Sequence, residues 1–196
     1  MNQDLAEELE YMIDLLAKSG FFSCDEIIEI LQDQFIEEDI DFSKVDISLN
    51  NYSNDNFSKL ERVFNNLASQ DIVAIHNCGY DIEEGVGDAF ELFVHLTNNK
   101  FNPIGFCFYT FEDIEEAIFD NKLRITFGDF ENNIDKAVEI GNTVAENLKE
   151  ENFNIDWDGT VNNHIVIVPF SWDKSFDFNK DYEIEGAYEV FTKNRC

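Results

Sequence analysis

The sequence predicts an α/β fold in which a mixed sheet of about five strands is covered by helices and follows an N-terminal helical region. The first third carries apolar side chains at helical spacing, and from Asp71 onward short apolar runs alternate with amphipathic segments. The chain has 196 residues, 44% of them hydrophobic, which is enough for one core. We therefore expect a single domain over 1–196, with a helical region over 1–70 and an α/β core over 71–196.

Three helices are expected in the helical region. A first apolar stripe is formed by Leu5, Leu9, Met12 and Leu16. Its spacing of four and three predicts a helix over about 3–18 that ends at Gly20. The second and third helices each follow a Ser-x-x-Glu sequence with the spacing of a capping box. These boxes are Ser23 with Glu26 and Ser58 with Glu61.

Five apolar runs predict the strands of the core. They lie near 72–76, 104–109, 123–127, 153–157 and 165–168. The first is continuously apolar, as in strands that are buried on both faces. The last two flank a polar loop and predict an antiparallel pair at one edge of the sheet.

Helices are expected between these strands. Thr110 is placed to cap a short helix, and a longer one follows the third strand. The longer helix carries Ala137, Gly141 and Ala145 as a stripe of small residues, which lets a helix lie close to a sheet. The segment after Ser171 gives no clear pattern.

Charge is the strongest compositional signal. The chain has 42 Asp and Glu against 13 Lys and Arg, a formal net charge of -29. Such a field repels nucleic acid and anionic membranes and favours basic partners or cations. We therefore expect a basic protein as the partner, and neither nucleic acid nor a membrane. Solubilisation alone explains the charge equally well, because net charge does not fix a function.

The sequence predicts a cytoplasmic protein. Its first residues contain neither a basic start nor an apolar stretch, and no apolar run reaches the ~18 to 20 residues that span a bilayer. The cysteines are widely spaced and form no CxxC pair. They are Cys24, Cys78, Cys107 and Cys196. We expect four free thiols and no disulfide.

A candidate binding or active-site loop follows the first strand. Its residues are His76, Asn77, Cys78, Tyr80 and Asp81. Loops at the carboxyl ends of strands are where α/β folds bind ligands. His76 has the chemistry of a general base and Cys78 that of a nucleophile. The interpretation that we prefer is a structural turn, with Gly79 in an unusual backbone conformation and Cys78 buried.

A candidate acidic face follows this loop on a predicted helix. It consists of Glu84, Asp88, Glu91 and His95, at spacings of four, three and four, opposite Phe90, Phe93 and Val94. The side chains of this row could coordinate a cation. A solvated helix face is the commoner explanation of such a row, and we predict no metal site. A second acidic group ends the second helix, at Glu37, Glu38, Asp39 and Asp41.

A partial calcium motif lies between the last two strands. Its oxygens come from Asn154, Asp156, Asp158, Thr160 and Asn162. The closing Glu of a calcium loop falls on Ile165, so we expect simple turn chemistry at Asp158 and Gly159. The chain also lacks GxGxxG, Walker A, GxSxG and HExxH sequences, and we predict no cofactor.

Four short segments resemble a known family. They are His76–Tyr80, Gly105–Tyr109, Thr126–Gly128 and Trp157–Gly159. Together they are similar to a bacterial family of uncharacterised proteins that bears only a domain-of-unknown-function label. The resemblance covers about 70–173 and leaves the helical first third outside. It implies a bacterial, single-domain protein and no particular activity.

We favour a non-enzymatic binding protein whose acidic surface meets a basic protein, as an immunity-type inhibitor or a nucleic-acid mimic does. A small enzyme that uses His76 and Cys78 is the second hypothesis. A cation-binding module that uses the acidic row is the third.

Overall fold

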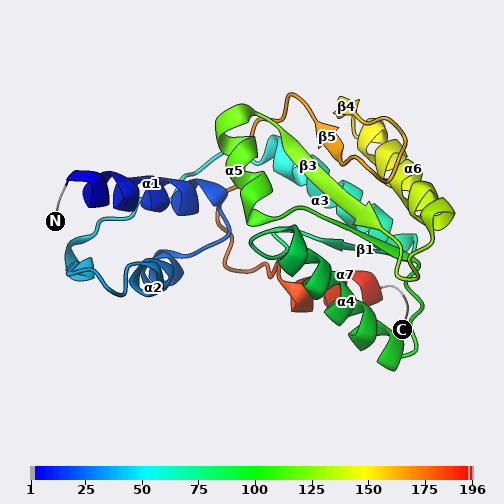
Figure 1. The fold of residues 1–196 in the computed structure, drawn as a ribbon, viewed down its shortest axis with the longest axis horizontal. Coiled ribbons are helices and arrows are strands. Elements are labelled where there is room, and N and C mark those ends of the chain that lie inside the picture. The colour runs from blue at the N-terminus through cyan, green and yellow to red at the C-terminus, as the bar shows by residue number, and fades with distance from the viewer. Residues whose placement is uncertain (1–2, 194, 196) are drawn as a thin grey trace. The chain divides into compact units, whose positions relative to one another are not determined.

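The computed structural model describes residues 3–193 and residue 195, and Figure 1 shows its α/β fold. In chain order the elements are α1 (Gln3–Ser19), α2 (Cys24–Gln34), the 3-10 helix η1 (Phe42–Lys44), α3 (Asp55–Ser69), β1 (Ile72–Ile75), α4 (Ile82–Asn98), β2 (Gly105–Phe108), α5 (Phe111–Asp120), β3 (Leu123–Gly128), α6 (Ile134–Glu150), β4 (Ile155–Asp156), β5 (Ile165–Ile167) and α7 (Ile184–Thr192). The predicted mixed sheet of five strands and the N-terminal helices are confirmed. None of the described helices has the length and apolar content needed to cross a membrane.

The chain divides into two compact units. The first contains the residues up to Asn54 and the returning segment Asp173–Asn179. The second contains Asp55–Trp172 and the residues from Lys180 onward, and therefore holds the whole sheet. The helix α3, which the sequence pattern grouped with the helical region, belongs to this second unit.

The first unit is built on α1 and α2. Gly20 ends α1 with a φ of +71°, a left-handed conformation that favours glycine. The predicted capping box at the start of α2 is confirmed, because the Ser23 hydroxyl accepts the Glu26 N–H at 3.3 Å. In return, a carboxylate oxygen of Glu26 accepts the Ser23 N–H at 2.7 Å.

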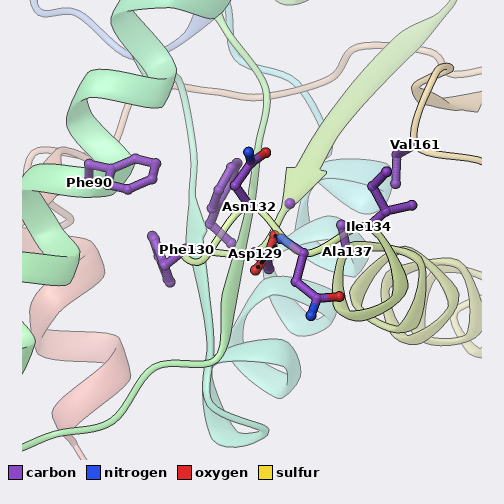
Figure 2. Close-up of a pocket in the computed structure, with 10 residues that line it drawn as sticks. Phe90, Asp129, Phe130, Asn132, Ile134, Ala137 and Val161 are labelled. Atoms are coloured by element: carbon purple, nitrogen blue, oxygen red, sulfur yellow. Dashed lines mark hydrogen bonds between the residues drawn. The ribbon is translucent and has the colours of Figure 1, made fainter.

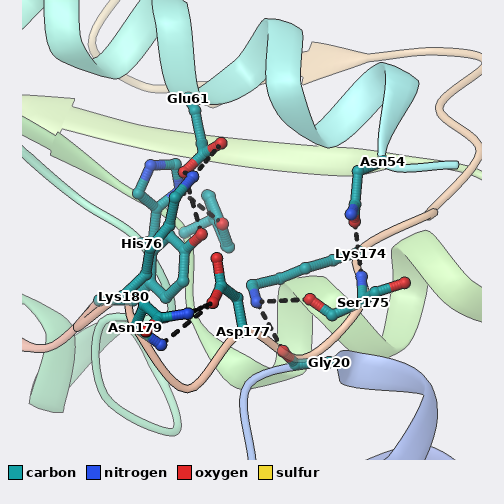
Figure 3. Close-up of polar contacts among 11 residues, drawn as sticks. Gly20, Asn54, Glu61, His76, Lys174, Ser175, Asp177, Asn179 and Lys180 are labelled. Atoms are coloured by element: carbon teal, nitrogen blue, oxygen red, sulfur yellow. Dashed lines mark hydrogen bonds and ion pairs between the residues drawn. The ribbon is translucent and has the colours of Figure 1, made fainter. Parts of the chain in front are cut away.

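A buried lysine holds the returning segment in the first unit. The Lys174 ammonium donates a hydrogen bond to the Gly20 carbonyl oxygen at 2.5 Å (Figure 3) and lies 4.5 Å from the centre of the Phe21 ring. The backbones are so close that a Cβ on Gly20 would lie 2.4 Å from the Lys174 carbonyl oxygen. The Ser175 N–H also donates to the Asn54 side-chain oxygen at 2.6 Å. The segment Asp173–Asn179 is thus an integral part of the first unit.

The sheet of the second unit has the strand order β1-β2-β3-β5-β4. β1 and β2 are parallel, with Ile72 opposite Gly105, and the remaining pairs are antiparallel. The predicted antiparallel pair at one edge is confirmed as β4 with β5, although β4 spans only Ile155–Asp156. Because β3 runs against β2, its end at Gly128 lies beside Phe106, near the start of β2.

Helices cover both faces of the sheet near β1 and β2 (Figure 1). The alternation along β2 shows which helix covers which face. A Cβ on Gly105 would lie 2.7 Å from the Ile140 side chain of α6. On the opposite face, the Phe108 ring is so close to α4 that a Cβ on Gly85 would lie 2.5 Å from it. α3 packs beside α6, and α7 packs beside α4.

Two expectations about helix ends have different outcomes. Thr110 caps α5 through a complete capping box with Asp113, as its position predicted. The prediction of a capping box at Ser58 is wrong, because α3 begins at Asp55 and Ser58 lies inside its first turn. Glu61 instead reaches across to the C-terminal segment, where its carboxylate accepts hydrogen bonds from Lys180 at 2.7 Å and from the Tyr182 hydroxyl at 2.9 Å.

The predicted small-residue stripe places α6 directly on the sheet. A Cβ on Gly141 would lie 2.6 Å from the Phe127 ring and 2.8 Å from the Trp157 ring. We therefore expect Gly141→Ala to lower the free energy of unfolding by about 1–3 kcal/mol through overpacking. Urea unfolding followed by circular dichroism measures this change.

Gly87 provides a matched control in α4, because nothing lies within 4 Å of a Cβ built on it. Gly87→Ala should raise the free energy of unfolding by roughly 0.5–1 kcal/mol, since alanine loses less backbone entropy in a helix. Equal stabilities for the two alanine variants would contradict the close packing of α6.

Candidate functional site

The loop from His76 to Asp81 is a tight turn that joins β1 to α4. Asn77 and Gly79 both have positive φ angles, of 49° and 68°. The Cys78 N–H donates to the Tyr109 carbonyl oxygen at 2.9 Å, and the Gly79 carbonyl accepts the Phe111 N–H at 3.1 Å. These bonds fix the loop to the connection that follows the neighbouring strand β2. The loop has both features expected of a structural turn, a left-handed Gly79 and a buried Cys78.

His76 lies in an aromatic cluster on the α3 side of the sheet. Its ring stacks on Phe64 with 4.3 Å between ring centres, and its Nδ1 lies 2.8 Å from the Tyr109 hydroxyl. Burial raises the pKa of Tyr109 well above its ordinary value, and the nearby Tyr182 and Glu61 add to this effect. Tyr109 is therefore a neutral partner that holds the imidazole in place.

Cys78 lies on the other face, in the core that α4 covers. Its Sγ is 3.3 Å from the Gly85 carbonyl oxygen and 3.9 Å from an Asp88 carboxylate oxygen. Burial, followed by the negative charge of Asp88, raises the pKa of this thiol above its ordinary range. A protonated thiol is a poor nucleophile, and the structure does not bring His76 and Cys78 together.

The other loop residues serve the turn and the start of α4. Asp81 is the N-cap of α4, and its carboxylate accepts the Glu84 N–H at 3.0 Å. The Tyr80 side chain is exposed and lies against the Phe111 ring, with 6.2 Å between ring centres. The side-chain oxygen of Asn77 is buried and has no hydrogen-bond partner among the described residues.

The acidic row occupies one flank of α4. Glu84, Glu91 and His95 are exposed, whereas Asp88 is half-buried beside Cys78. Partial burial raises the pKa of Asp88, and repulsion by Glu91 and Glu84 raises it further. In the part of the chain that the structure describes, no Lys or Arg forms an ion pair with this row. Nor do any three His, Cys, Asp or Glu of these described residues gather as ligands of a metal ion.

Phe90 and Phe93 lie on the opposite flank of α4, as expected, but they do not form its core-facing stripe. The buried residues of this helix are Gly85, Ala89, Leu92 and Leu96. Phe90 and Val94 remain 40% and 51% exposed. The face of α4 that packs on the core is therefore formed by small and medium-sized residues, whereas the Phe90 ring lies at the surface.

A pocket of about 420 Å³ lies beside Phe90, at the opposite end of the sheet from the His76 loop. It is lined by Phe90, Phe106, Gly128, Asp129, Phe130, Asn132, Asn133, Ile134, Ala137 and Val161. Figure 2 shows Phe90 and Phe130 on one side, Ile134 and Val161 on the other, and Asp129 between them. The lining is therefore mostly apolar with a carboxylate at its centre.

Asp129 is fixed by the backbone that surrounds it. Its carboxylate accepts the Glu131 N–H at 2.9 Å and the Asn133 N–H at 2.9 and 3.1 Å. Asn133 in turn caps α6, because its side chain accepts the Lys136 N–H at 3.1 Å. The loop Asp129–Asn133 is thus a rigid bridge between the end of β3 and the start of α6.

Sequence reasoning did not identify this pocket. Its walls come from α4, from Phe106 of β2, from the continuous stretch 128–137 and from the loop after β4, four segments that are far apart along the chain. The only local signal is the polar run that follows Gly128, where an Asp and two Asn lie between a strand and a helix.

The segment with a partial calcium motif forms a turn. The Asp158 carboxylate accepts hydrogen bonds from the Thr160 N–H and hydroxyl at 2.9 Å and from the Asn163 amide at 2.6 Å. These bonds, with that from Asn163 first, lower the pKa of Asp158. Gly159 has a φ of +80°. These features support the turn interpretation.

The comparisons with known proteins identify a family and no relative of known function. A family model described as a domain of unknown function, DUF6891, matches residues 2–176. The match includes α1 and the segment of Lys174, so it extends beyond the resemblance over 70–173 into the helical first third. No curated protein and no solved structure matches the chain.

Thiol reactivity tests the environment of the buried cysteines. Cys24 is exposed, Cys78 and Cys107 are buried, and Cys196 lies outside the described residues. Burial raises the pKa of Cys107 as it does that of Cys78. In a variant with Cys24→Ser and Cys196→Ser, we expect the native protein to react only slowly with a thiol reagent, even near pH 9, above the ordinary thiol pKa of about 8.5.

The unmodified chain in denaturant without reductant should show all four thiols. A count below four would reveal a disulfide, and rapid labelling of Cys78 in the native variant would contradict its burial.

Proposed function

The chain belongs to the DUF6891 family, a domain of unknown function, and we propose that it is a protein-binding module whose acidic surface recognises a basic protein. The mode of action would be that of an immunity-type inhibitor or a nucleic-acid mimic. The observation that carries the proposal is an acidic row on α4 that no basic side chain of the described residues neutralises. The proposed setting is a bacterial cytoplasm, where buried thiols such as Cys78 and Cys107 remain reduced.

Most basic side chains of the protein bind groups of the same chain. More than half of the 13 form ion pairs with acids of the same chain. The pairs are Lys18–Asp14, Lys44–Asp41, Arg62–Glu151, Arg124–Asp113, Lys136–Glu131, Lys180–Glu61 and Arg195–Asp71. Lys174 is buried against carbonyl oxygens. The negative excess therefore stays on the surface, where a partner can reach it.

The row on α4 is better suited to recognition than the other acidic group. In the second group, Asp41 is already paired with Lys44 at 2.7 Å, and that contact lowers the pKa of Asp41. In the row on α4, by contrast, Asp88 is repelled by Glu84 and Glu91. A cationic partner would relieve this repulsion, and α4 is a regular helix that holds the row in a fixed arrangement.

Charge reversal tests the proposal. We expect Asp88→Lys with Glu91→Lys to slow association with a basic protein captured on the immobilised chain, by about tenfold at low ionic strength. The loss should shrink at high salt, because screening weakens the attraction that it removes. Stopped-flow or surface-plasmon measurements at several salt concentrations give the rates.

Glu37→Lys with Glu38→Lys is the matched control, since it changes the net charge equally at exposed positions of the first unit. It should slow association clearly less. Glu84→Lys with Glu91→Lys, at two exposed positions, replaces the first variant if half-buried Asp88 does not tolerate lysine. Equal slowing by the α4 and control variants would leave only a general charge effect and refute recognition through α4.

A further inference from the structure

We propose that the pocket beside Phe90 binds an arginine side chain of the basic partner. This inference rests on the proposed function and adds to it a defined site and a defined chemical group. It follows from the size of the pocket, its aromatic walls, its carboxylate and the charge of the whole chain.

The size of the pocket fits a single long side chain. Its volume of about 420 Å³ lies near the lower end of the range of about 300–1,000 Å³ that holds small ligands. The lining includes exposed apolar groups at its rim, where Phe90 is 40%, Ile134 67% and Val161 38% exposed. Such groups suit the methylene stem of an arginine, which packs on apolar surface while its charged end seeks a partner.

Aromatic rings form one wall. The Phe130 ring lies 5.3 Å from both the Phe90 and the Phe106 ring, measured between centres, and meets Phe90 edge to face. Phe93 stacks on Phe130 at 4.3 Å and so fixes its orientation. A guanidinium is flat and weakly hydrated, so it stacks on such rings better than an ammonium does.

The carboxylate of Asp129 supplies the opposite charge. It is 9% exposed and is held by backbone N–H groups of Glu131 and Asn133. A carboxylate offers about four acceptor positions, so these bonds leave room for a further donor. The Lys136 ammonium, which the charge of Asp129 also attracts, forms its ion pair with Glu131. A cation entering the pocket therefore meets a preorganised acceptor.

The same carboxylate argues against an anionic ligand. Helix N-termini such as that of α6 favour anions, but here Asp129 already accepts the Asn133 N–H at this end of the helix. A phosphate or carboxylate would meet the charge of Asp129 and a chain with a net charge of -29. The electrostatics thus select a cation.

The pocket also adjoins the helix of the acidic row. Phe90 lines the pocket and is the neighbour of Glu91 on α4. A basic segment anchored by one arginine in the pocket would place its other charges along this helix. Arginine is a frequent anchor of protein interfaces because it combines apolar packing with directed hydrogen bonds.

A peptide titration tests the inference. The probe is a capped Gly-Ser-Arg-Ser-Gly peptide, and binding is followed by amide chemical shifts of the isotope-labelled full chain. We expect shifts at 129–134 and around Phe90. The same peptide with citrulline, which keeps the shape and loses the charge, should bind about tenfold more weakly, and the lysine peptide should also bind more weakly.

Matched variants locate the site. Asp129→Asn and Phe90→Ala should each weaken binding of the arginine peptide about fivefold or more. Asp135→Asn, at an exposed position in the first turn of α6, removes the same charge outside the pocket, and Phe178→Ala removes an 84% exposed ring elsewhere. Both controls should leave binding unchanged. Asparagine at position 129 keeps an oxygen for the backbone bonds, and Phe90→Ala tests the site without disturbing them.

Equal binding of the arginine and citrulline peptides, or equal binding of the lysine peptide, would overturn the proposal, as would shifts that avoid the pocket. Failure of the inference is distinguishable from failure of the proposed function. A basic protein that binds α4 but is insensitive to Asp129→Asn and Phe90→Ala would refute the pocket alone. An arginine peptide that binds the pocket, together with a basic protein insensitive to Asp88→Lys and Glu91→Lys, would refute recognition through the acidic row alone.

Discussion

The protein has 13 basic side chains against 42 acidic ones, and more than half of these few cations form ion pairs within the chain. Several of them connect segments that are far apart in sequence. Arg62 of α3 binds Glu151 at the end of α6, and Lys180 binds Glu61 of α3. Arg124 of β3 binds the nearly buried carboxylate of Asp113 in α5. Since each such contact consumes a cation inside the fold, the surface keeps a strong negative field.

The two candidate regions of the second unit, the His76 loop and α4, differ in what they offer a partner. The His76 loop is fixed by backbone bonds, its imidazole is held by Tyr109, and Cys78 is a buried thiol. These features describe a structural turn. One flank of α4 carries acids that no Lys or Arg of the described residues pairs with, and the other flank borders an aromatic pocket. We infer that α4 is the element on which recognition centres.

The sequence predicted those features that depend on local spacing. The five strands, the caps at Ser23 and Thr110 and the close approach of Gly141 follow from short patterns. The separation of His76 from Cys78 did not follow, because it depends on the positive φ of Asn77, which turns the chain between them. The pocket was missed because four separate segments build it, and single-sequence periodicity carries no information on their contacts.

Hydrogen exchange of the full chain, with and without a bound basic protein, tests most directly whether recognition centres on α4. We predict added protection of amides in α4, over Ile82–Asn98, and in the loop that carries Asp129. Protection confined to α1 and α2, or to the His76 loop, would contradict it. An unchanged exchange pattern across α4 in a stable complex would indicate that the acidic charge of this helix only keeps the protein soluble.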